Sequence, residues 1–428
     1  MSPVPRNTHC FADIGSCLAG FEAKFRWFIV RVFVLMHKYN LPSPPFYKIL
    51  FARIIVFAAV LSFSASVTAV NAYPPPSLPK IDARGYLLLD AHSGIVLAEK
   101  DADERVEPAS LTKMMTSYVA FSELRSGNIG WDEKVLISEK AWRTSGSRTY
   151  VEVNTHVPVS ILLKGVIIQS GNDASVALAE HIAGDELAFA QRMNQQAKRL
   201  GLKDSHFMNA SGLPGADHYT TVRDMAWLGV FLIRDFPELY KLHSIKSYEY
   251  NSIKQYNRNK LLWQDGSVDG IKTGYTAGAG YCLVVSARRD GMRLVSVVMG
   301  TKSAKARTKA TRTLLNYGFR FFKTRRLYDA NVPLNRVRVW KGNTNDLDIG
   351  LAEPFYITVP KGQFDHLTVN MEFNTKIIAP VEAGDVHGKL RVMLGDEILF
   401  TRPVVSLQSI QKGGLWRRVS DSVRMYFH

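Results

Sequence analysis

The spacing of apolar residues changes along the chain and predicts its elements. Two pairs of apolar runs that flank short polar turns predict hairpins at residues 85–98 and 281–299. Helical spacing predicts helices near residues 110–119, 159–168, 174–182, 188–200, 221–234 and 304–322. Because strands stand at both ends of this segment and helices lie between them, we expect one α+β domain at residues 73–334 whose sheet joins its two ends.

From about Asn335 the pattern becomes an alternation of apolar and polar residues. Val337 and Val339 alternate with arginines, and a similar alternation surrounds Leu390. Alternation with period two is typical of strands that bury one face. The pattern therefore predicts a small all-β domain, a sandwich, at residues 335–411.

The last segment, residues 412–428, predicts an amphipathic helix. Apolar residues recur every four positions with basic residues between them: Leu415, Val419, Val423 and Phe427, with Arg417, Arg418 and Arg424. A short basic amphipathic helix that also carries Trp416 and Tyr426 suits a membrane interface, so we expect a membrane-anchoring helix. A terminal helix docked on the protein's own surface is the alternative.

The first 72 residues have the order of an export signal. Lys48 and Arg53 flank an apolar run at residues 54–63, and small residues follow up to Ala72. The run is short for a membrane-spanning helix, so we expect a signal peptide that is cleaved after Ala72. The segment is long for a leader, and Met36 is an alternative start of translation.

Composition and charge narrow the range of partners. The 428 residues are 46% hydrophobic and 21% charged, as in globular proteins, and the formal net charge is +16. That excess favours an anionic partner or surface, but no signature of a nucleic-acid-binding domain accompanies it. Cys10 and Cys17 fall in the leader, so Cys282, in an apolar run, is expected to be a buried structural thiol.

The tetrad Ser110-Leu111-Thr112-Lys113 places a hydroxyl and an amine one helical turn apart. An unassisted serine is a poor nucleophile, and a lysine on the same helical face can take its proton. Two other Ser-x-x-Lys tetrads occur, at residues 77–80 and 409–412, but neither lies in a helical apolar stripe. For the tetrad taken alone, a helix N-cap is the simpler interpretation of Ser110.

Two further short motifs carry polar groups in places where apolar residues prevail. Ser170-Gly171-Asn172 forms a polar turn between two apolar helices, and Lys272-Thr273-Gly274 lies in a predicted strand. Gly274 would let a substrate come close to the strand edge. An ordinary tight turn and a surface lysine are the simpler interpretations of each motif taken alone.

The three motifs in this order resemble those of penicillin-binding proteins and serine β-lactamases. Beyond the motifs, residues 108–116, 169–174, 257–263 and 269–274 are similar to low-molecular-mass penicillin-binding proteins, the D-alanyl-D-alanine carboxypeptidases. The resemblance covers most of the chain after Tyr86. It implies a transpeptidase-like domain, an antiparallel sheet with a helical region, followed by a β-sandwich and an amphipathic helix.

The resemblance also implies the reaction and its residues. Ser110 would attack the bond between two terminal D-alanines of a peptidoglycan stem peptide, with Lys113 as base. Ser170 would pass a proton to the leaving amine, and Asn172 would hold the substrate amide. The substrate carboxylate would be bound by Lys272, Thr273, Gly274 and Arg307. The oxyanion hole would be formed by the backbone N–H groups of Ser110 and Tyr275.

Partners and alternatives follow from the same resemblance. β-Lactams imitate the D-alanyl-D-alanine bond and would acylate Ser110, no cofactor or metal is implied, and the expected location is the periplasmic face of the bacterial inner membrane. A β-lactamase would use the same residues, although no glutamate-x-x-x-asparagine element, which the class A enzymes need, follows Asn172. A DD-endopeptidase would also use them, and the sequence does not exclude it. A non-catalytic murein-binding protein is the second alternative.

Overall fold

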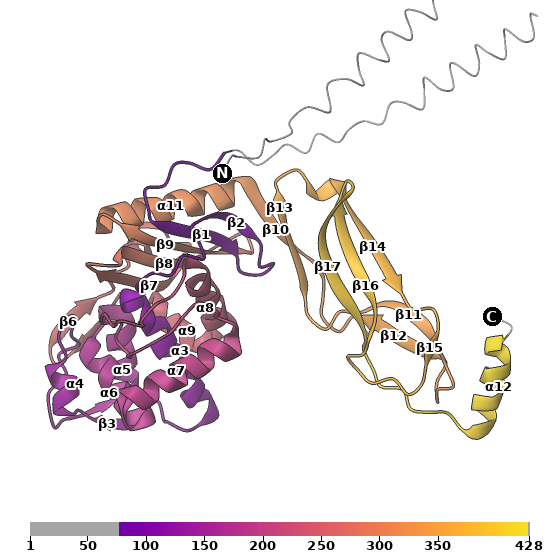
Figure 1. Ribbon diagram of the computed structural model, residues 1–428, viewed down its shortest axis with the longest axis horizontal. Coiled ribbons are helices and arrows are strands. Elements are labelled where there is room, and N and C mark those ends of the chain that lie inside the picture. Colours follow the sequence, from indigo (N-terminus) through magenta and orange to yellow (C-terminus); the bar gives the residue numbers. More distant parts are fainter. Residues whose placement is uncertain (1–76, 427–428) are drawn as a thin grey trace, which may run out of the picture. The chain divides into compact units, whose positions relative to one another are not determined.

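The computed structural model describes residues 77–426, so the expected leader, with Cys10 and Cys17, lies outside the described residues. Its central element is a five-stranded antiparallel sheet in the order β2-β1-β9-β8-β7 (Figure 1). The strands are β1 (Gly85–Asp90), β2 (Val96–Lys100), β7 (Val268–Thr276), β8 (Gly280–Arg289) and β9 (Met292–Thr301). The pairing of β1 with β9 confirms that the sheet joins the two ends of the α+β region.

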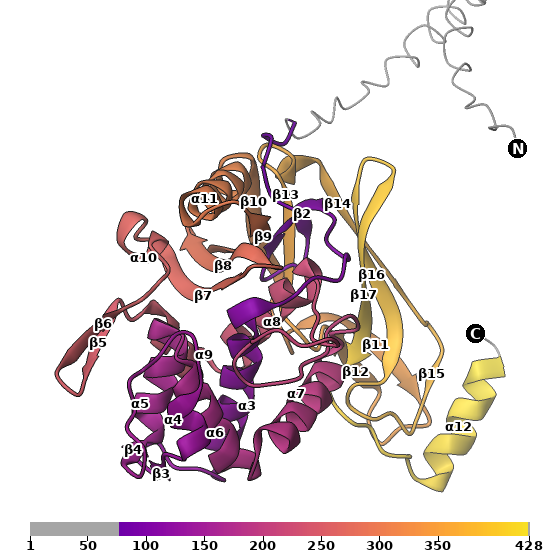
Figure 2. The ribbon, with the colours of Figure 1, turned by 60° about the vertical axis from the view of Figure 1, so that its left-hand side comes forward.

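Both faces of this sheet are covered. Leu87 and Leu89 of β1 belong to one apolar core, and Leu88 between them belongs to the other, as the period of two requires. Helix α11 (Ala304–Phe321) packs on one face, and α8 (Val222–Asp235) packs on the opposite face (Figure 2). A strand that is buried on both sides needs a continuous apolar run, which explains the sequence of β1.

The helical region between β2 and β7 contains the other predicted helices. They are α3 (Lys113–Ser126), α5 (Val159–Lys164), α6 (Asn172–Ala183) and α7 (Glu186–Leu200). Shorter elements connect them: η1 (Ala109–Thr112), β3 (Lys134–Leu136), α4 (Glu139–Arg143), β4 (His156–Pro158), the π-helical turn η2 (Gly165–Gln169), α9 (Pro237–Tyr240), η3 (Lys241–Ser244), β5 (Ser247–Tyr250), β6 (Ile253–Tyr256) and α10 (Leu261–Gln264). The predicted helices are confirmed, with the end of the 159–168 segment widened into the π turn.

An all-β domain follows, as predicted. A six-stranded sheet has the order β14-β16-β17-β12-β11-β15, and β10 pairs with β13 in a second sheet. The bounds are β10 (Phe322–Tyr328), β11 (Pro333–Trp340), β12 (Asp346–Gly350), β13 (Phe355–Pro360), η4 (Phe364–His366), β14 (Leu367–Phe373), β15 (Ile377–Ile378), β16 (Val386–Leu394) and β17 (Glu397–Ser406). Apolar residues from both sheets share one core.

The β structure begins upstream of residue 335, the expected boundary. β10 starts at Phe322, directly after α11, and its register with β13 runs from Phe322 to Tyr328. Four of its seven residues are Lys, Thr or Arg, so the sequence hid the alternation inside a basic run. In β11 the alternation is plain, because Val337 and Val339 are buried and the neighbouring Arg336 and Arg338 are exposed.

The C-terminal helix α12 (Leu415–Tyr426) turns its polar side toward the β domain. Asp421 is buried and accepts a hydrogen bond of 2.6 Å from the backbone N–H of Lys341, and Arg417 donates to the carbonyl oxygen of Asn343 at 3.3 Å. The apolar side of α12 is exposed. Within residues 77–426, no helix is long and apolar enough to cross a membrane.

Candidate active site

The nucleophile candidate lies on a tight turn rather than on the α-helix itself. Ser110 belongs to the 3₁₀ turn η1, and Lys113 begins α3. Residues three apart eclipse one another in a 3₁₀ turn, which places the Ser110 hydroxyl 3.2 Å from the Lys113 amine. The expected Ser–Lys contact is therefore present, but a 3₁₀ turn makes it where a first α-helical turn was predicted.

Lys113 is buried, and its amine has three oxygen neighbours. Besides Ser110, these are Oδ1 of Asn172 at 2.7 Å and the carbonyl oxygen of Ser211 at 2.5 Å. Burial lowers the pKa of Lys113 from its usual 10.5 to about 7, with a further lowering by the charge of Arg258. A neutral amine has two N–H groups and one lone pair. The two carbonyl-type oxygens take the N–H groups, so the lone pair is left for the Ser110 hydroxyl.

The second serine is paired with the second lysine. Ser170 ends the π turn in a left-handed conformation, with φ of 68°, and its hydroxyl lies 2.9 Å from the amine of Lys272. That amine also donates to the carbonyl oxygen of Thr273 at 3.0 Å. Lys272 is fully buried, and burial together with the charge of Lys113 holds its pKa well below the usual value. It therefore lies beneath the site and contacts Ser170.

Glycine brings the strand and the nucleophile turn together. A Cβ atom on Gly274 would lie 3.3 Å from Cγ of Leu111 and 3.4 Å from Cβ of Ala109. The close approach that Gly274 permits is thus between β7 and η1, whereas the sequence suggested an approach of substrate. Gly212, with φ of 82°, lies against the same turn, because its Cβ would fall 1.9 Å from the carbonyl oxygen of Ala109.

An open cavity of about 470 Å³ lies over these groups. It is lined by Ser110, Gly146, Ser147, Ser170, Asn172, Ser211, Gly212, Leu213, Arg258, Thr273, Gly274, Tyr275, Thr276, Tyr281 and Arg307. Arg307 donates to the carbonyl oxygens of Gly274 and Cys282 at 2.9 and 3.2 Å, which fixes its guanidinium at the wall. A larger groove beside α11 and β10 holds no serine–lysine pair, so volume alone does not identify the site.

All nine residues predicted for the site come together here. Seven of them line the cavity, while Lys113 and Lys272 lie beneath it. Sequence reasoning missed Ser211, which contributes only a backbone carbonyl, and Arg258, whose position in the run at residues 257–263 carried no chemical signal. Cys282 is a buried free thiol, which confirms the prediction for that cysteine.

Comparison with known proteins identifies the family. The model of the D-alanyl-D-alanine carboxypeptidase family matches residues 70–303, and the model of the penicillin-binding protein 5 C-terminal domain matches residues 322–412. The chain belongs to the D-alanyl-D-alanine carboxypeptidase family. It is therefore a serine-peptidase hydrolase of the low-molecular-mass penicillin-binding protein group.

Individual relatives cover different shares of this carboxypeptidase. The D-alanyl-D-alanine carboxypeptidase DacC of Escherichia coli K12 is 41% identical over 374 residues, which are 86% of this chain and 94% of that protein. Penicillin-binding protein 5 of Haemophilus influenzae is 40% identical, with a TM-score of 0.75 over 78% of this chain and 99% of that chain. Penicillin-binding protein D2 of Listeria monocytogenes, in its ampicillin-bound form, is 31% identical, with a TM-score of 0.52 over 56% of this chain and all of that one.

Proposed function

We propose that this carboxypeptidase removes the terminal D-alanine from peptidoglycan stem peptides through an acyl-enzyme on Ser110. The observation that carries the proposal is the hydrogen bonding of Lys113. Its amine is buried, its pKa is lowered to about 7, and its two N–H groups have acceptors other than Ser110. The amine lone pair is then available for the Ser110 proton, which is what an acyl transfer by serine requires.

Acylation forms one bond and breaks another. The Ser110 oxygen attacks the carbonyl carbon between the two D-alanines while its proton moves to the Lys113 amine. The backbone N–H groups of Ser110 and Tyr275 form the oxyanion hole for the negative oxygen of the tetrahedral intermediate. As the intermediate collapses, the C–N bond breaks and the leaving amine needs a proton.

Ser170 and Lys272 supply the route for that proton. The Ser170 hydroxyl lines the cavity and accepts a hydrogen bond from Lys272, so it can donate its own proton to the leaving amine and be recharged from the lysine behind it. As D-alanine departs, the proton that Lys113 took from Ser110 replaces the one that Lys272 supplied, so Lys113 is neutral again. Lys113 then takes a proton from the water that attacks the ester and gives it to the Ser110 oxygen as the ester bond breaks. The products are the shortened stem peptide and free enzyme.

The substrate carboxylate binds at the β7 side of the cavity. Thr273 offers a hydroxyl, and Arg307 offers a guanidinium that two backbone carbonyls hold in place. Charge-assisted hydrogen bonds to a carboxylate are the stronger kind, so Arg307 supplies most of this recognition. Lys272 contributes positive potential from below. Asn172 Oδ1 has a second lone pair with which to accept from the substrate amide.

β-Lactams are expected to acylate the same serine. The Listeria monocytogenes relative is known in an ampicillin-bound form. Penicillin presents a strained amide beside a carboxylate, which suits the same oxyanion hole and the same Arg307. We therefore infer a penicilloyl adduct on Ser110 that is slow to hydrolyse relative to turnover of the peptide.

The defining experiment compares three substrates with the purified mature chain. We expect D-alanine release from a free pentapeptide to exceed both cleavage of crosslinked murein and hydrolysis of penicillin. Faster murein cleavage would identify a DD-endopeptidase, and faster penicillin hydrolysis would identify a β-lactamase. Absence of any penicilloyl adduct by mass spectrometry would leave the non-catalytic murein-binding alternative.

We also propose that α12 anchors the enzyme at the periplasmic face of the inner membrane after export. Asp421 and Arg417 hold its polar side against the β domain, whereas large apolar side chains on the other side are exposed: Leu415, Trp416, Val419, Val423 and Tyr426. Arg418 and Arg424 are exposed beside them. An apolar face bordered by arginines matches an anionic bilayer interface.

A further inference from the structure

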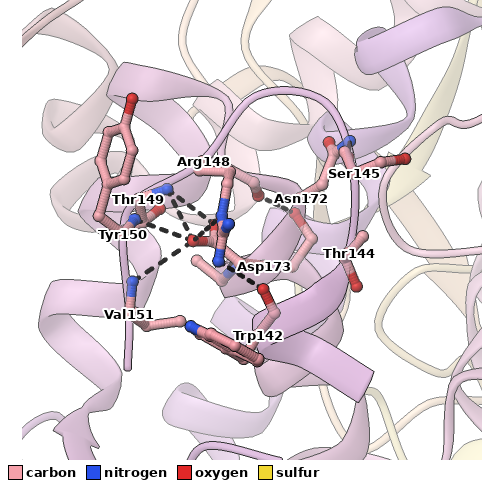
Figure 3. Close-up of polar contacts among 12 residues, drawn as sticks. Trp142, Thr144, Ser145, Arg148, Thr149, Tyr150, Val151, Asn172 and Asp173 are labelled. Atoms are coloured by element: carbon pink, nitrogen blue, oxygen red, sulfur yellow. Dashed lines mark hydrogen bonds and ion pairs between the residues drawn. The ribbon is translucent and has the colours of Figure 1, made fainter. Parts of the chain in front are cut away.

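The loop at residues 145–151 is tied to the start of α6 by a buried carboxylate. Asp173 has no exposed surface, and its two oxygens accept hydrogen bonds from the backbone N–H groups of Thr149 at 2.8 Å, Tyr150 at 2.9 Å and Val151 at 3.4 Å. The guanidinium of Arg148 lies 4.0 Å away. Figure 3 shows the carboxylate inside the curve of this loop. A buried charge needs such a set of donors, so the loop and the carboxylate stabilise one another.

The same loop holds the side chain of Asn172. Nδ2 of Asn172 donates to the carbonyl oxygen of Ser145 at 2.6 Å, and the Asn172 backbone N–H donates to the carbonyl oxygen of Ser147 at 2.7 Å. With Nδ2 directed at Ser145, the amide oxygen faces Lys113 at 2.7 Å. Gly146, with φ of 93°, leaves room for the amide, because a Cβ there would lie 2.6 Å from Nδ2.

We propose that Asp173 is a positioning residue for the acyl transfer: it anchors the 145–151 loop, whose carbonyl groups hold the Asn172 amide against Lys113. The motif at residues 170–172 thereby extends by one residue, to Asp173. The inference rests on the proposed roles of Ser110 and Lys113. Asparagine has the same shape as aspartate but replaces one acceptor oxygen with a donor, which would meet backbone N–H groups here. Asp173→Asn therefore loosens the loop without changing its volume.

The loss of charge in Asp173→Asn would not by itself slow acylation. Burial and Arg258 lower the pKa of Lys113, whereas the charges of Asp173 and Glu186 raise it. Loss of the Asp173 charge therefore lowers the pKa of Lys113 and enlarges its neutral fraction at pH 7. A fall in the acylation rate at that pH then reports displaced geometry.

The test measures penicillin acylation by single-turnover kinetics together with active-site stoichiometry. For Asp173→Asn we expect one penicilloyl group per chain, an acylation rate constant about 10- to 100-fold lower, and a noncovalent affinity within about threefold of the parent. Gly146→Ala, which displaces the same amide while Asp173 stays intact, should give the same pattern and covers the case in which Asp173→Asn does not fold. Asp185→Asn removes an exposed carboxylate that caps α7 through Ala188 N–H, and should leave the rate unchanged.

A double-mutant cycle identifies the route of the effect. If Asp173 acts through Asn172, then Asp173→Asn in an Asn172→Ala background should lower the acylation rate by less than about threefold further. If the two substitutions have fully additive effects on the acylation rate, the proposal is overturned. It is also overturned if Asp173→Asn lowers the stoichiometry or the melting temperature but leaves the rate per acylated site unchanged, because the carboxylate would then be purely structural. Failure of the parent to form an adduct on Ser110 would instead refute the proposed function.

Discussion

The active site buries ionisable side chains, whereas the C-terminal helix exposes apolar ones. Both are the reverse of what is usual in a folded protein. At the site, Lys113, Lys272 and Asp173 are buried, although such side chains are almost always exposed. On α12, Leu415 and Trp416 are 72% and 87% exposed. Burying charge and exposing apolar surface both cost folding free energy, so each departure indicates a function.

The two regions differ in what offsets that cost. The buried groups of the site find their partners inside the chain: backbone carbonyls for the lysines and backbone N–H groups for Asp173. Within the described residues, the apolar side chains of α12 stay mostly exposed, while its polar side is docked through Asp421. Chemistry at the site can therefore be deduced from contacts within the chain, whereas the role of α12 depends on a surface outside it.

The largest expected effect removes the nucleophile. Ser110→Ala should lower D-alanine release by at least about 10⁴-fold, because among the described residues no other hydroxyl is hydrogen-bonded to the Lys113 amine. The measurement is D-alanine release from a pentapeptide, with a penicilloyl adduct followed by mass spectrometry. Ser409→Ala, in another Ser-x-x-Lys tetrad, is the control and should retain full activity. Adduct formation in Ser110→Ala would show that a different residue is acylated.

The second effect is the pH dependence of acylation. Ser110 is activated only when Lys113 is neutral, and the pKa of Lys113 is lowered to about 7, so kcat/KM should fall about tenfold per pH unit below pH 7. For a lysine in water, the same fall in kcat/KM would begin near pH 10.5. A pH profile of kcat/KM for the pentapeptide checks the value. A flat profile from pH 5 to 8 would contradict the assignment of Lys113 as base.

A smaller effect concerns recognition of the carboxylate. Arg307→Ala should raise KM for the pentapeptide about 30-fold with less change in kcat, because it removes a charge-assisted hydrogen bond from the cavity wall. Arg312→Ala, on the exposed side of the same helix, is the matched control. Equal losses in the two variants would mean that only the general positive field of α11 matters.

The smallest effect tests α12. Trp416→Ala should weaken binding to anionic phospholipid vesicles about tenfold and leave D-alanine release in solution unchanged, since Trp416 lies outside the catalytic groups. Vesicle co-sedimentation gives the partition. Leu187→Ala, which removes a side chain 67% exposed on α7, should have no effect. Unaltered vesicle binding of Trp416→Ala would favour a helix that serves only the protein's own surface.

Much of the fold was predictable because its elements have strong periodicity. The two hairpins, the helices and the alternation in β11 follow from spacing alone. The start of β10 was missed, since Phe322 to Tyr328 is mostly basic and polar. The resemblance implies that Lys272 contacts the substrate carboxylate, whereas in the structure its amine lies below Ser170. The position of a residue in a strand does not indicate which distant side chain it will contact.

By itself, the sequence determined the chemistry of this protein: the hydroxyl, amine and amide types, their order, and the amphipathic end. The tertiary structure decided how they cooperate. Only the folded chain brings Ser211 and Asn172 to Lys113 and buries that amine, which lowers its pKa. Only there does Asp173 meet the loop that holds Asn172. The physical reason is that desolvation and hydrogen-bond geometry depend on residues distant in sequence, which local spacing does not encode.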